Sequence, residues 1–195
     1  MKTDIILSGV GGQGILTIAA VIGYAALNEN LYIKQAEVHG MSQRGGAVQS
    51  NLRISDKPIH SDLIPEGNAD IILSVEPLEA LRYLSYLSKD GWIVTNEQPF
   101  VNINNYPDID AIYNEIEAHK NHIMLNADKT AKETGNPKSS NIIMLGAAAQ
   151  FIHIRKENIL LAIQQLFERK GSEVIEQNIM AFDIGWSYTE KIKKN

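Results

Sequence analysis

The stretch that most constrains the fold is Ser8-Gly9-Val10-Gly11-Gly12-Gln13-Gly14-Ile15, close to the N-terminus. It follows the apolar run Ile5-Ile6-Leu7 and precedes an apolar, periodic segment at 16–27. This order predicts a strand, a glycine turn and a helix. Glycine permits positive φ angles and close approach by a ligand. The helix N-terminus beyond it offers unpaired N–H groups and a positive dipole end to an anion.

The segments that follow predict a repeating strand–helix order. A second strand over 31–38 completes a βαβ unit, whose crossover is expected to be right-handed. The apolar run at 70–75 is typical of a strand covered on both faces, and Pro77 fits the first turn of a helix that reaches about Leu87. Asp90-Gly91 reads as a turn before a strand at 92–95.

Between the second strand and the run at 70–75 the pattern changes. Residues 47–54 alternate between apolar and polar, which predicts a half-buried strand. Asp56-Lys57-Pro58 is a turn signal, and 59–64 is expected to be a short return strand. The region therefore predicts a β-hairpin-like excursion after the second strand.

The remaining chain predicts mostly helices. They are expected at 110–119, 128–133, 142–152, 156–169 and 172–194, with one short strand at 123–126. Together the segments predict a three-layer, Rossmann-like α/β fold: a mostly parallel sheet with helices on both faces. With 195 residues and no dividing linker, a single domain over 1–195 is expected.

Composition narrows the function classes. The formal net charge is −5 and basic residues cluster only in the tail, so nucleic-acid binding is disfavoured. The chain has no cysteine, which excludes disulfides, a thiolate nucleophile and iron–sulfur clusters held by this chain. No apolar run approaches the roughly 18 residues of a transmembrane helix, and no signal-peptide pattern opens the chain. A soluble cytoplasmic protein is expected.

The glycine turn admits two interpretations. Gly9, Gly11 and Gly14 satisfy G-x-G-x-x-G after a strand and before a helix, and Glu37 lies near the end of the second strand, as in dinucleotide sites. The turn is not a Walker A loop, because Ile15-Leu16 stands where Lys-Ser/Thr is required. It either contacts an anion or nucleotide, or serves only tight strand–helix packing.

The second candidate is the loop His39-Gly40-Met41-Ser42-Gln43-Arg44-Gly45-Gly46. It is expected at the same carboxyl edge of the sheet as the glycine turn, where ligands bind. The Arg44 guanidinium suits bidentate capture of a carboxylate or phosphate, and His39, Ser42 and Gln43 add hydrogen-bonding capacity. Equally, Arg44 could be structural or lie at a subunit interface. The predicted ligand-binding set is Gly9, Gly11, Gly12, Gln13, Gly14, Glu37, His39, Ser42, Gln43, Arg44, Gly45 and Gly46.

Other polar residues are weaker candidates. His119 and His122 lie three apart at a predicted helix end, where capping or solvent exposure is the simpler interpretation than a metal site. Ser42 and His39 lack a nucleophile elbow. Glu76, Asn96 and Glu97 follow other strands and are candidates to line the same cleft. The sequence gives no catalytic residue and no metal site on this chain.

Both motifs resemble one known family. Gly9-Val10-Gly11-Gly12-Gln13-Gly14 resembles the opening of the gamma domain of 2-oxoacid:ferredoxin oxidoreductases, and Glu37 to Gly46 is similar to the second signature. The His-Gly-Met-Ser-Gln form of that signature is similar to the indolepyruvate oxidoreductase beta subunits. The stretch 141–147 and the closing stretch 178–185 resemble two further family segments, so the resemblance spans nearly the whole chain.

The resemblance implies a reaction that needs a partner. The holoenzymes convert an arylpyruvate, CoA and oxidised ferredoxin to an aryl-acetyl-CoA, CO₂ and reduced ferredoxin. Thiamine diphosphate and iron–sulfur clusters are expected on a large alpha subunit. This chain would bind no cofactor tightly, would help to bind CoA or substrate and close the active site, and would be inactive alone.

Two other functions stay open from the sequence. One is a stand-alone NAD- or FAD-binding Rossmann-like oxidoreductase, which Glu37 permits. The other is a non-catalytic scaffold subunit whose glycines serve interface packing. No direct contact with nucleic acid or membrane is expected, and ferredoxin is expected to be reached through the complex.

Overall fold

The computed structural model describes residues 1–39, 45–101 and 103–194, and at His39 it describes the backbone alone. The strands and helices follow in this order: β1 (Lys2–Val10), α1 (Ile15–Asn28), β2 (Tyr32–His39), β3 (Ala47–Ser55), β4 (Ala69–Ser74), α2 (Pro77–Leu81), β5 (Leu87–Asn96), α3 (Ile109–Glu117), β6 (His122–Leu125), α4 (Ala127–Glu133), α5 (Ser140–Ala148), α6 (Lys156–Phe167) and α7 (Ser172–Lys193). Short 3₁₀ turns lie at Leu84–Tyr86, Ala149–Phe151 and Glu168–Lys170.

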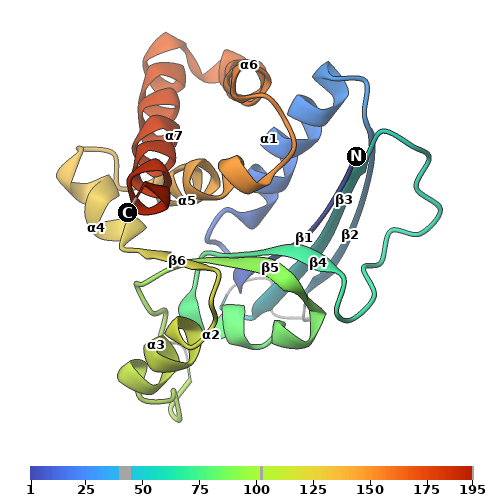
Figure 1. Ribbon diagram of the computed structural model, residues 1–195. Helices are drawn as coiled ribbons and strands as arrows, with labels where there is room; N and C mark the ends of the chain where they lie inside the picture. The colour runs from blue at the N-terminus through green and yellow to red at the C-terminus, as the bar shows by residue number, and fades with distance from the viewer. Residues whose placement is uncertain (40–44, 102, 195) are drawn as a thin grey trace.

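One six-stranded sheet in the order β2-β3-β1-β4-β5-β6 forms the middle layer. The pairs β1–β4, β4–β5 and β5–β6 are parallel, whereas β1–β3 and β2–β3 are antiparallel. Helices cover both faces: α1, α5, α6 and α7 lie on one side, and α2 and α3 on the other (Figure 1). The predicted α/β class, with a mostly parallel sheet between helical layers, is confirmed.

β1 lies in the middle of the sheet, between β3 and β4. Ile5, Ile6 and Leu7 are fully buried, and their side chains divide between the two faces. Ile5 and Leu7 belong to the larger core under α1 and α5, and Ile6 belongs to the smaller core under α2 and α3. The N-terminal apolar run therefore places the glycine turn at the middle of the carboxyl edge.

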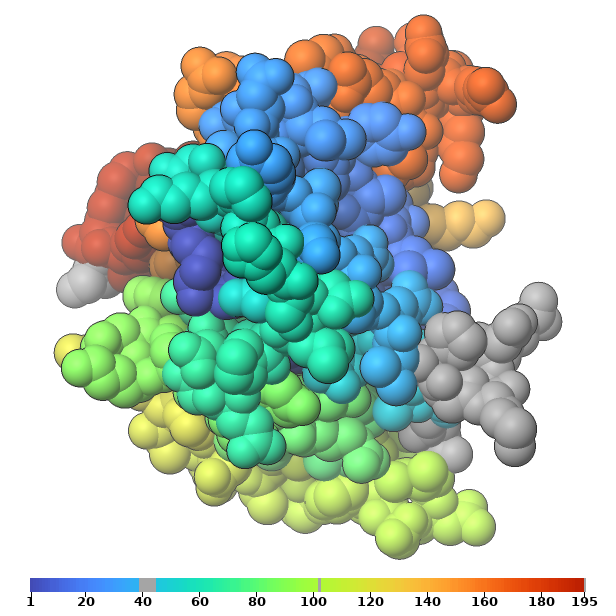
Figure 2. All heavy atoms as spheres, turned by 90° about the vertical axis from the view of Figure 1, so that its right-hand side faces the viewer, coloured from blue at the N-terminus to red at the C-terminus, as the bar shows by residue number. Residues whose placement is uncertain are grey.

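The antiparallel part differs from the expected βαβ unit. β2 does not pair with β1, because β3 lies between them and pairs with both. The hairpin expected between 47–54 and a return strand at 59–64 is wrong, since 59–64 has no regular secondary structure; the excursion is instead a β2–β3 hairpin. Arg53 instead donates to the carbonyl oxygens of Ser61 and Leu63 at 3.1 and 3.0 Å. Figure 2 looks onto the β2 side and shows the segment after β3, in teal, across this face.

The α2–β5 region corrects two further predictions. The helix from Pro77 ends at Leu81 rather than near Leu87, because Leu87 already pairs with Ala69 in the sheet. Asp90-Gly91 is not a turn but lies within β5, where the register with β4 shifts. A Cβ on Gly91 would lie 2.8 Å from the Ala69 carbonyl oxygen, so glycine allows the close strand approach of this bulge.

Candidate functional site

The glycine turn connects β1 to α1 and is held by its own side chains. Gln13 Oε1 accepts from the Val10 backbone N–H at 2.7 Å, and Gln13 Nε2 donates to the Val75 carbonyl oxygen at 3.4 Å. The Gln13 N–H also donates to the Val10 carbonyl oxygen at 3.1 Å. The Gln13 side chain therefore stabilises the turn, and its amide oxygen and nitrogen both bond to backbone groups of this chain.

The glycines of the turn have different structural roles. A Cβ on Gly9 would overlap Val75, and a Cβ on Gly14, whose φ is +84°, would overlap the Asn141 side chain. These two positions serve close packing. Gly12 has a φ of +102° and a Cβ there would meet nothing within 4 Å, so this residue faces open space.

The second sequence motif joins the turn through backbone hydrogen bonds. The Gly11 N–H donates to the Gly46 carbonyl oxygen at 2.8 Å, and the Gly45 N–H donates to the Gly11 carbonyl oxygen at 3.3 Å. The structure therefore brings the two glycine motifs together at one edge, as the parallel-sheet argument predicted. Ser42, Gln43 and Arg44 lie outside the described residues, and their predicted roles stay predictions.

A pocket of about 460 Å³ opens beside this turn. Its walls are Val10, Gly11, Gly12, Gly14, Ile15, Leu16, Glu37 and Val48. Among the described residues, the N–H groups of Gly12, Ile15 and Leu16 have no hydrogen-bond partner, and no side chain caps α1. The pocket thus combines apolar walls with free donors at the positive end of a helix dipole, which suits an anionic group.

Glu37 is the acidic group of this pocket. It lies on β2 opposite Ser50 of β3, near the end of the strand. In dinucleotide sites an acid near this position accepts hydrogen bonds from ribose hydroxyls. Its carboxylate would repel a phosphate placed beside it, so an anion is favoured at the α1 end of the pocket rather than at the β2 end.

A smaller pocket of about 180 Å³ lies on the other side of Gly45 and Gly46, against α2. Glu76, one of the weaker sequence candidates, lies in its wall and is 1% exposed. Its carboxylate accepts from the Glu79 N–H at 2.8 Å, from the Phe100 N–H at 3.3 Å and from the Tyr106 hydroxyl. Burial, followed by this bond to Glu76, raises the pKa of the Tyr106 hydroxyl, so Tyr106 remains a donor.

The other weaker candidates have structural roles. Asn96 donates to the Val75 carbonyl oxygen at 3.3 Å and to Asp128 at 2.6 Å, which ties β5 to α4. His122 Nδ1 lies 2.7 Å from the His119 carbonyl oxygen, which fits the expected helix-end role. Within 1–39, 45–101 and 103–194, no cluster of three His, Cys, Asp or Glu side chains is arranged to hold a metal.

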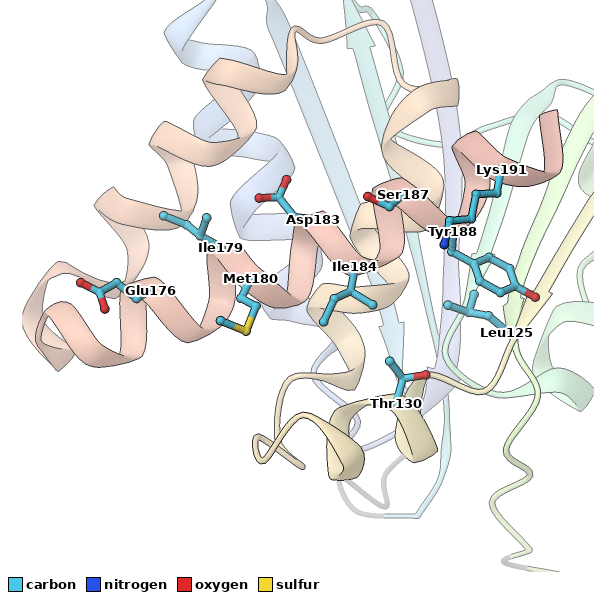
Figure 3. Close-up of a pocket in the computed structure, with 10 residues that line it drawn as sticks. All are labelled: Leu125, Thr130, Glu176, Ile179, Met180, Asp183, Ile184, Ser187, Tyr188 and Lys191. Atoms are coloured by element: carbon cyan, nitrogen blue, oxygen red, sulfur yellow. The ribbon is translucent and has the colours of Figure 1, made fainter. Parts of the chain in front are cut away.

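A larger pocket lies elsewhere, along α7. It measures about 700 Å³ and runs between α7, α4 and the end of β6; in Figure 3, Ile184 and Met180 point from α7 toward Thr130. Acidic and basic side chains flank it, including Glu176, Asp183 and Lys191, shown in the same view. It contains none of the residues that the sequence predicted as ligand-binding.

Sequence reasoning missed two features of the edge. Asn141 Nδ2 donates to the Gly14 carbonyl oxygen at 3.2 Å, a contact between residues 127 positions apart that no local pattern could reveal. Glu79 and Arg82 pair at 2.8 Å beside the smaller pocket. The spacing of Glu79 and Arg82, three residues apart on a predicted helix, could have predicted this ion pair.

The fold and this edge define a class: an α/β protein whose glycine turn borders a pocket and is joined to a second glycine motif. Residues 4–188 match the pyruvate ferredoxin/flavodoxin oxidoreductase family, and the chain belongs to that family. In the described ranges, no helix is long and apolar enough to cross a bilayer.

Curated relatives cover nearly the full chain. The indolepyruvate oxidoreductase subunit IorB of Pyrococcus horikoshii is 38% identical over 192 residues, covering 93% of each chain. The IorB subunit of Methanothermobacter thermautotrophicus is 35% identical, covering 95% of this chain and 97% of the relative. The 2-oxoglutarate synthase subunit KorC of Methanocaldococcus jannaschii is 30% identical, covering 98% and 96%.

Solved structures share the fold. The 2-oxoglutarate:ferredoxin oxidoreductase from Magnetococcus marinus, with 2-oxoglutarate, coenzyme A and succinyl-CoA bound, aligns with a TM-score of 0.79 at 21% identity, covering 97% of this chain. This chain spans 31% of that longer polypeptide. The gamma subunit of a keto/oxoacid ferredoxin oxidoreductase from Geobacter sulfurreducens aligns with a TM-score of 0.70 at 23% identity, covering 97% and 99%.

Proposed function

We propose that this chain is the small subunit of a ferredoxin-dependent oxidoreductase that converts an aryl 2-oxoacid, such as indolepyruvate, and CoA to the aryl-acetyl-CoA. The observation that carries the proposal is the 32–38% identity to IorB subunits along nearly the whole chain, against 23–30% to KorC subunits. The subunit would be inactive alone and would act in the cytoplasm.

A large subunit would complete the enzyme. It would carry thiamine diphosphate for the carbanion chemistry and iron–sulfur clusters for electron transfer to ferredoxin. This division agrees with a chain that has no cysteine to hold a cluster.

The carboxyl edge is the surface proposed to face that subunit. Large apolar side chains are exposed around it: Leu16, Val38, Phe100, Val101 and Ile103, between 38% and 67%. An apolar rim around an anion-accepting pocket is typical of a binding surface rather than of a solvent-facing edge. Docking here would also cover the pocket and exclude water from it.

Within this surface, the glycine-turn pocket is proposed to receive a CoA phosphate or the substrate carboxylate. The free N–H groups of Gly12, Ile15 and Leu16 would bind it, with Arg44 as a charged partner. Binding would be electrostatic and geometric, with no bond made or broken on this chain.

Purification tests the assembly first. A tagged chain purified from its source cell should retain a larger subunit that contains iron and thiamine diphosphate. The complex should reduce ferredoxin only when an aryl 2-oxoacid and CoA are both present. Tight binding of NAD or FAD by the chain, without such a subunit, would instead support the stand-alone oxidoreductase that Glu37 permits.

Two matched pairs test the surface. Leu16→Asp should weaken association with the large subunit, whereas Leu27→Asp should not, because Leu27 is equally exposed (59% against 55%) but lies at the other end of α1. Gly12→Asp should raise the KM for CoA about tenfold over Gly12→Ala, since both variants share the positive-φ strain and only one adds charge.

The predicted role of Arg44 is tested in the same complex. Arg44→Ala should raise the KM for CoA or for the 2-oxoacid. Unchanged turnover and unchanged KM values for both would exclude the anion-binding role. A scaffold role predicts that Gly11→Ala weakens subunit association without altering CoA affinity in the complex that forms.

A further inference from the structure

The smaller pocket contains a buried acid with an unused oxygen. Glu79 is 5% exposed, and its Oε1 accepts from Arg82 Nε at 2.8 Å. In the described part of the chain, Glu79 Oε2 has no hydrogen-bond partner although it is fully buried. A buried acceptor without a donor costs about 1–3 kcal/mol, so this oxygen marks a position where a donor is missing.

The neighbouring acid needs no such donor. Glu76 already accepts from two backbone N–H groups and from the Tyr106 hydroxyl. Since both carboxylate oxygens of Glu76 accept hydrogen bonds, the unused acceptor in the pocket wall is Glu79 Oε2. Burial raises the pKa of the Glu79 carboxyl, and the Glu76 charge adds to that effect while Arg82 opposes it.

The charges of the pocket exclude one kind of ligand. Two carboxyl groups, Glu76 and Glu79, lie in its wall with one guanidinium, Arg82, whose Nε is already held by Glu79. A carboxylate or phosphate placed here would meet both acids at short range. The pocket therefore suits a neutral group, while the anion-accepting donors lie on the other face of Gly45 and Gly46.

Size and lining indicate a ring. The volume is about 180 Å³, and an apolar cavity of about 150 Å³ holds a benzene molecule. Apolar walls come from Val10, Leu78, Phe100 and Ile103, with Phe100 and Ile103 43% and 38% exposed. A flat ring could enter between these two half-exposed side chains and lie above the α2 acid.

We infer that this pocket takes the indole ring of the aryl 2-oxoacid, with the ring N–H donating a hydrogen bond to Glu79 Oε2. The inference rests on the proposed function and adds a residue that sets substrate preference. A benzene ring fits the same walls but leaves Glu79 Oε2 unpaired, so the pocket favours indolepyruvate over phenylpyruvate. A site built to hydrogen-bond a substrate N–H discriminates strongly against an analogue that lacks it.

The test measures kcat/KM of the reconstituted complex for indolepyruvate and phenylpyruvate. Glu79→Leu should lower the ratio of the two values about tenfold, the equivalent of one lost hydrogen bond to a charged group. Glu79→Gln should also lower the ratio, because Arg82 Nε holds its one amide oxygen and its NH₂ group takes the Oε2 position, where it cannot accept the ring N–H. Thermal unfolding of each variant verifies that it is folded.

A second variant leaves the acid in place. Leu78→Trp, at a partly buried wall position on α2, should fill the pocket and raise the KM for both aryl substrates without changing the KM for CoA. An unchanged ratio in Glu79→Leu, or unchanged aryl KM values in Leu78→Trp, would overturn the inference while the proposed function stands. A wild-type complex that turns over neither aryl 2-oxoacid would reject the proposed function, and the inference with it.

Discussion

The crossing of α5 and α7 depends on two glycines, and replacing them tests how the larger core is built. A Cβ on Gly146 would overlap the Phe182 carbonyl oxygen, and a Cβ on Gly185 would overlap that of Ile143. The Gly185 Cβ would also lie 2.7 Å from the Ala147 backbone nitrogen. Because these are backbone atoms, no rotamer change can relieve the overlap, and the helices must move apart.

The expected cost follows from packing and propensity. Overpacking a core costs about 1–3 kcal/mol, and backbone contacts place Gly146→Ala and Gly185→Ala near the upper end. Alanine returns about 1 kcal/mol of helix propensity, which leaves a loss of about 2 kcal/mol for each variant. For a domain of this size, such a loss lowers Tm by about 4–8 °C.

The assay is urea and thermal unfolding followed by circular dichroism, with Gly23→Ala as the matched control. Gly23 lies in α1, and the nearest atom to its added Cβ is Ile33 Cδ1 at 3.4 Å, an ordinary contact. That variant should gain about 0.5–1 kcal/mol. If Gly146→Ala and Gly185→Ala were as stable as the wild type, close backbone contact between α5 and α7 would not exist in solution.

Three further predictions concern charge and capping. Arg53→Met should lower the free energy of unfolding by about 2 kcal/mol, because the fully buried Asp4 carboxylate loses the guanidinium that contacts it at 2.9 Å and keeps only the Lys2 ammonium at 2.8 Å; urea denaturation measures this loss, and a loss below 1 kcal/mol would contradict it. The folded-state pKa of Glu79 is raised from 4.5, so the contribution of Glu79 to stability is present below pH 4.5 and is lost as the pH rises through the raised pKa. Urea denaturation at several pH values should show this fall in stability for the wild type and not for Glu79→Gln. Parallel stability curves for the two proteins would contradict the prediction. Asp108→Ala should cost about 1 kcal/mol, because Asp108 accepts from two N–H groups at the start of α3 at 3.0 and 3.2 Å; unchanged urea unfolding would show that this cap contributes nothing.

Most of the fold could be predicted because its signals are local. Glycine and proline positions fixed the starts of α1 and α2, and apolar periodicity located α6 and α7 within a few residues. The errors arose where pairing partners are distant in sequence. Nothing in the pattern of β3 indicates that it inserts between β1 and β2, since an alternating strand reads the same in either place.

Some contacts of the candidate site could likewise be predicted from the sequence, and others could not. The meeting of the glycine turn with Gly45 and Gly46 followed from the rule that ligands bind at the carboxyl edge. The smaller pocket could not be predicted as a unit, because Tyr106 reaches Glu76 from a segment whose Asn- and Pro-rich sequence carries no periodic signal. The contact between Asn141 and Gly14 depends on how α5 packs beside α1, which propensity does not encode.

The insertion of β3 also bears on what the glycine turn can bind. In a dinucleotide site the turn's backbone is free to approach a pyrophosphate. Here the Gly11 N–H is engaged by Gly46 and the Gln13 N–H by Val10, so the donors that remain among the described residues are at Gly12, Gly14 and the first residues of α1. Two interpretations of the turn therefore hold at different residues: Gly9 and Gly14 serve packing, and Gly12 borders the open pocket. These donors gather at one helix N-terminus, which suits a single anionic group such as one CoA phosphate or the substrate carboxylate.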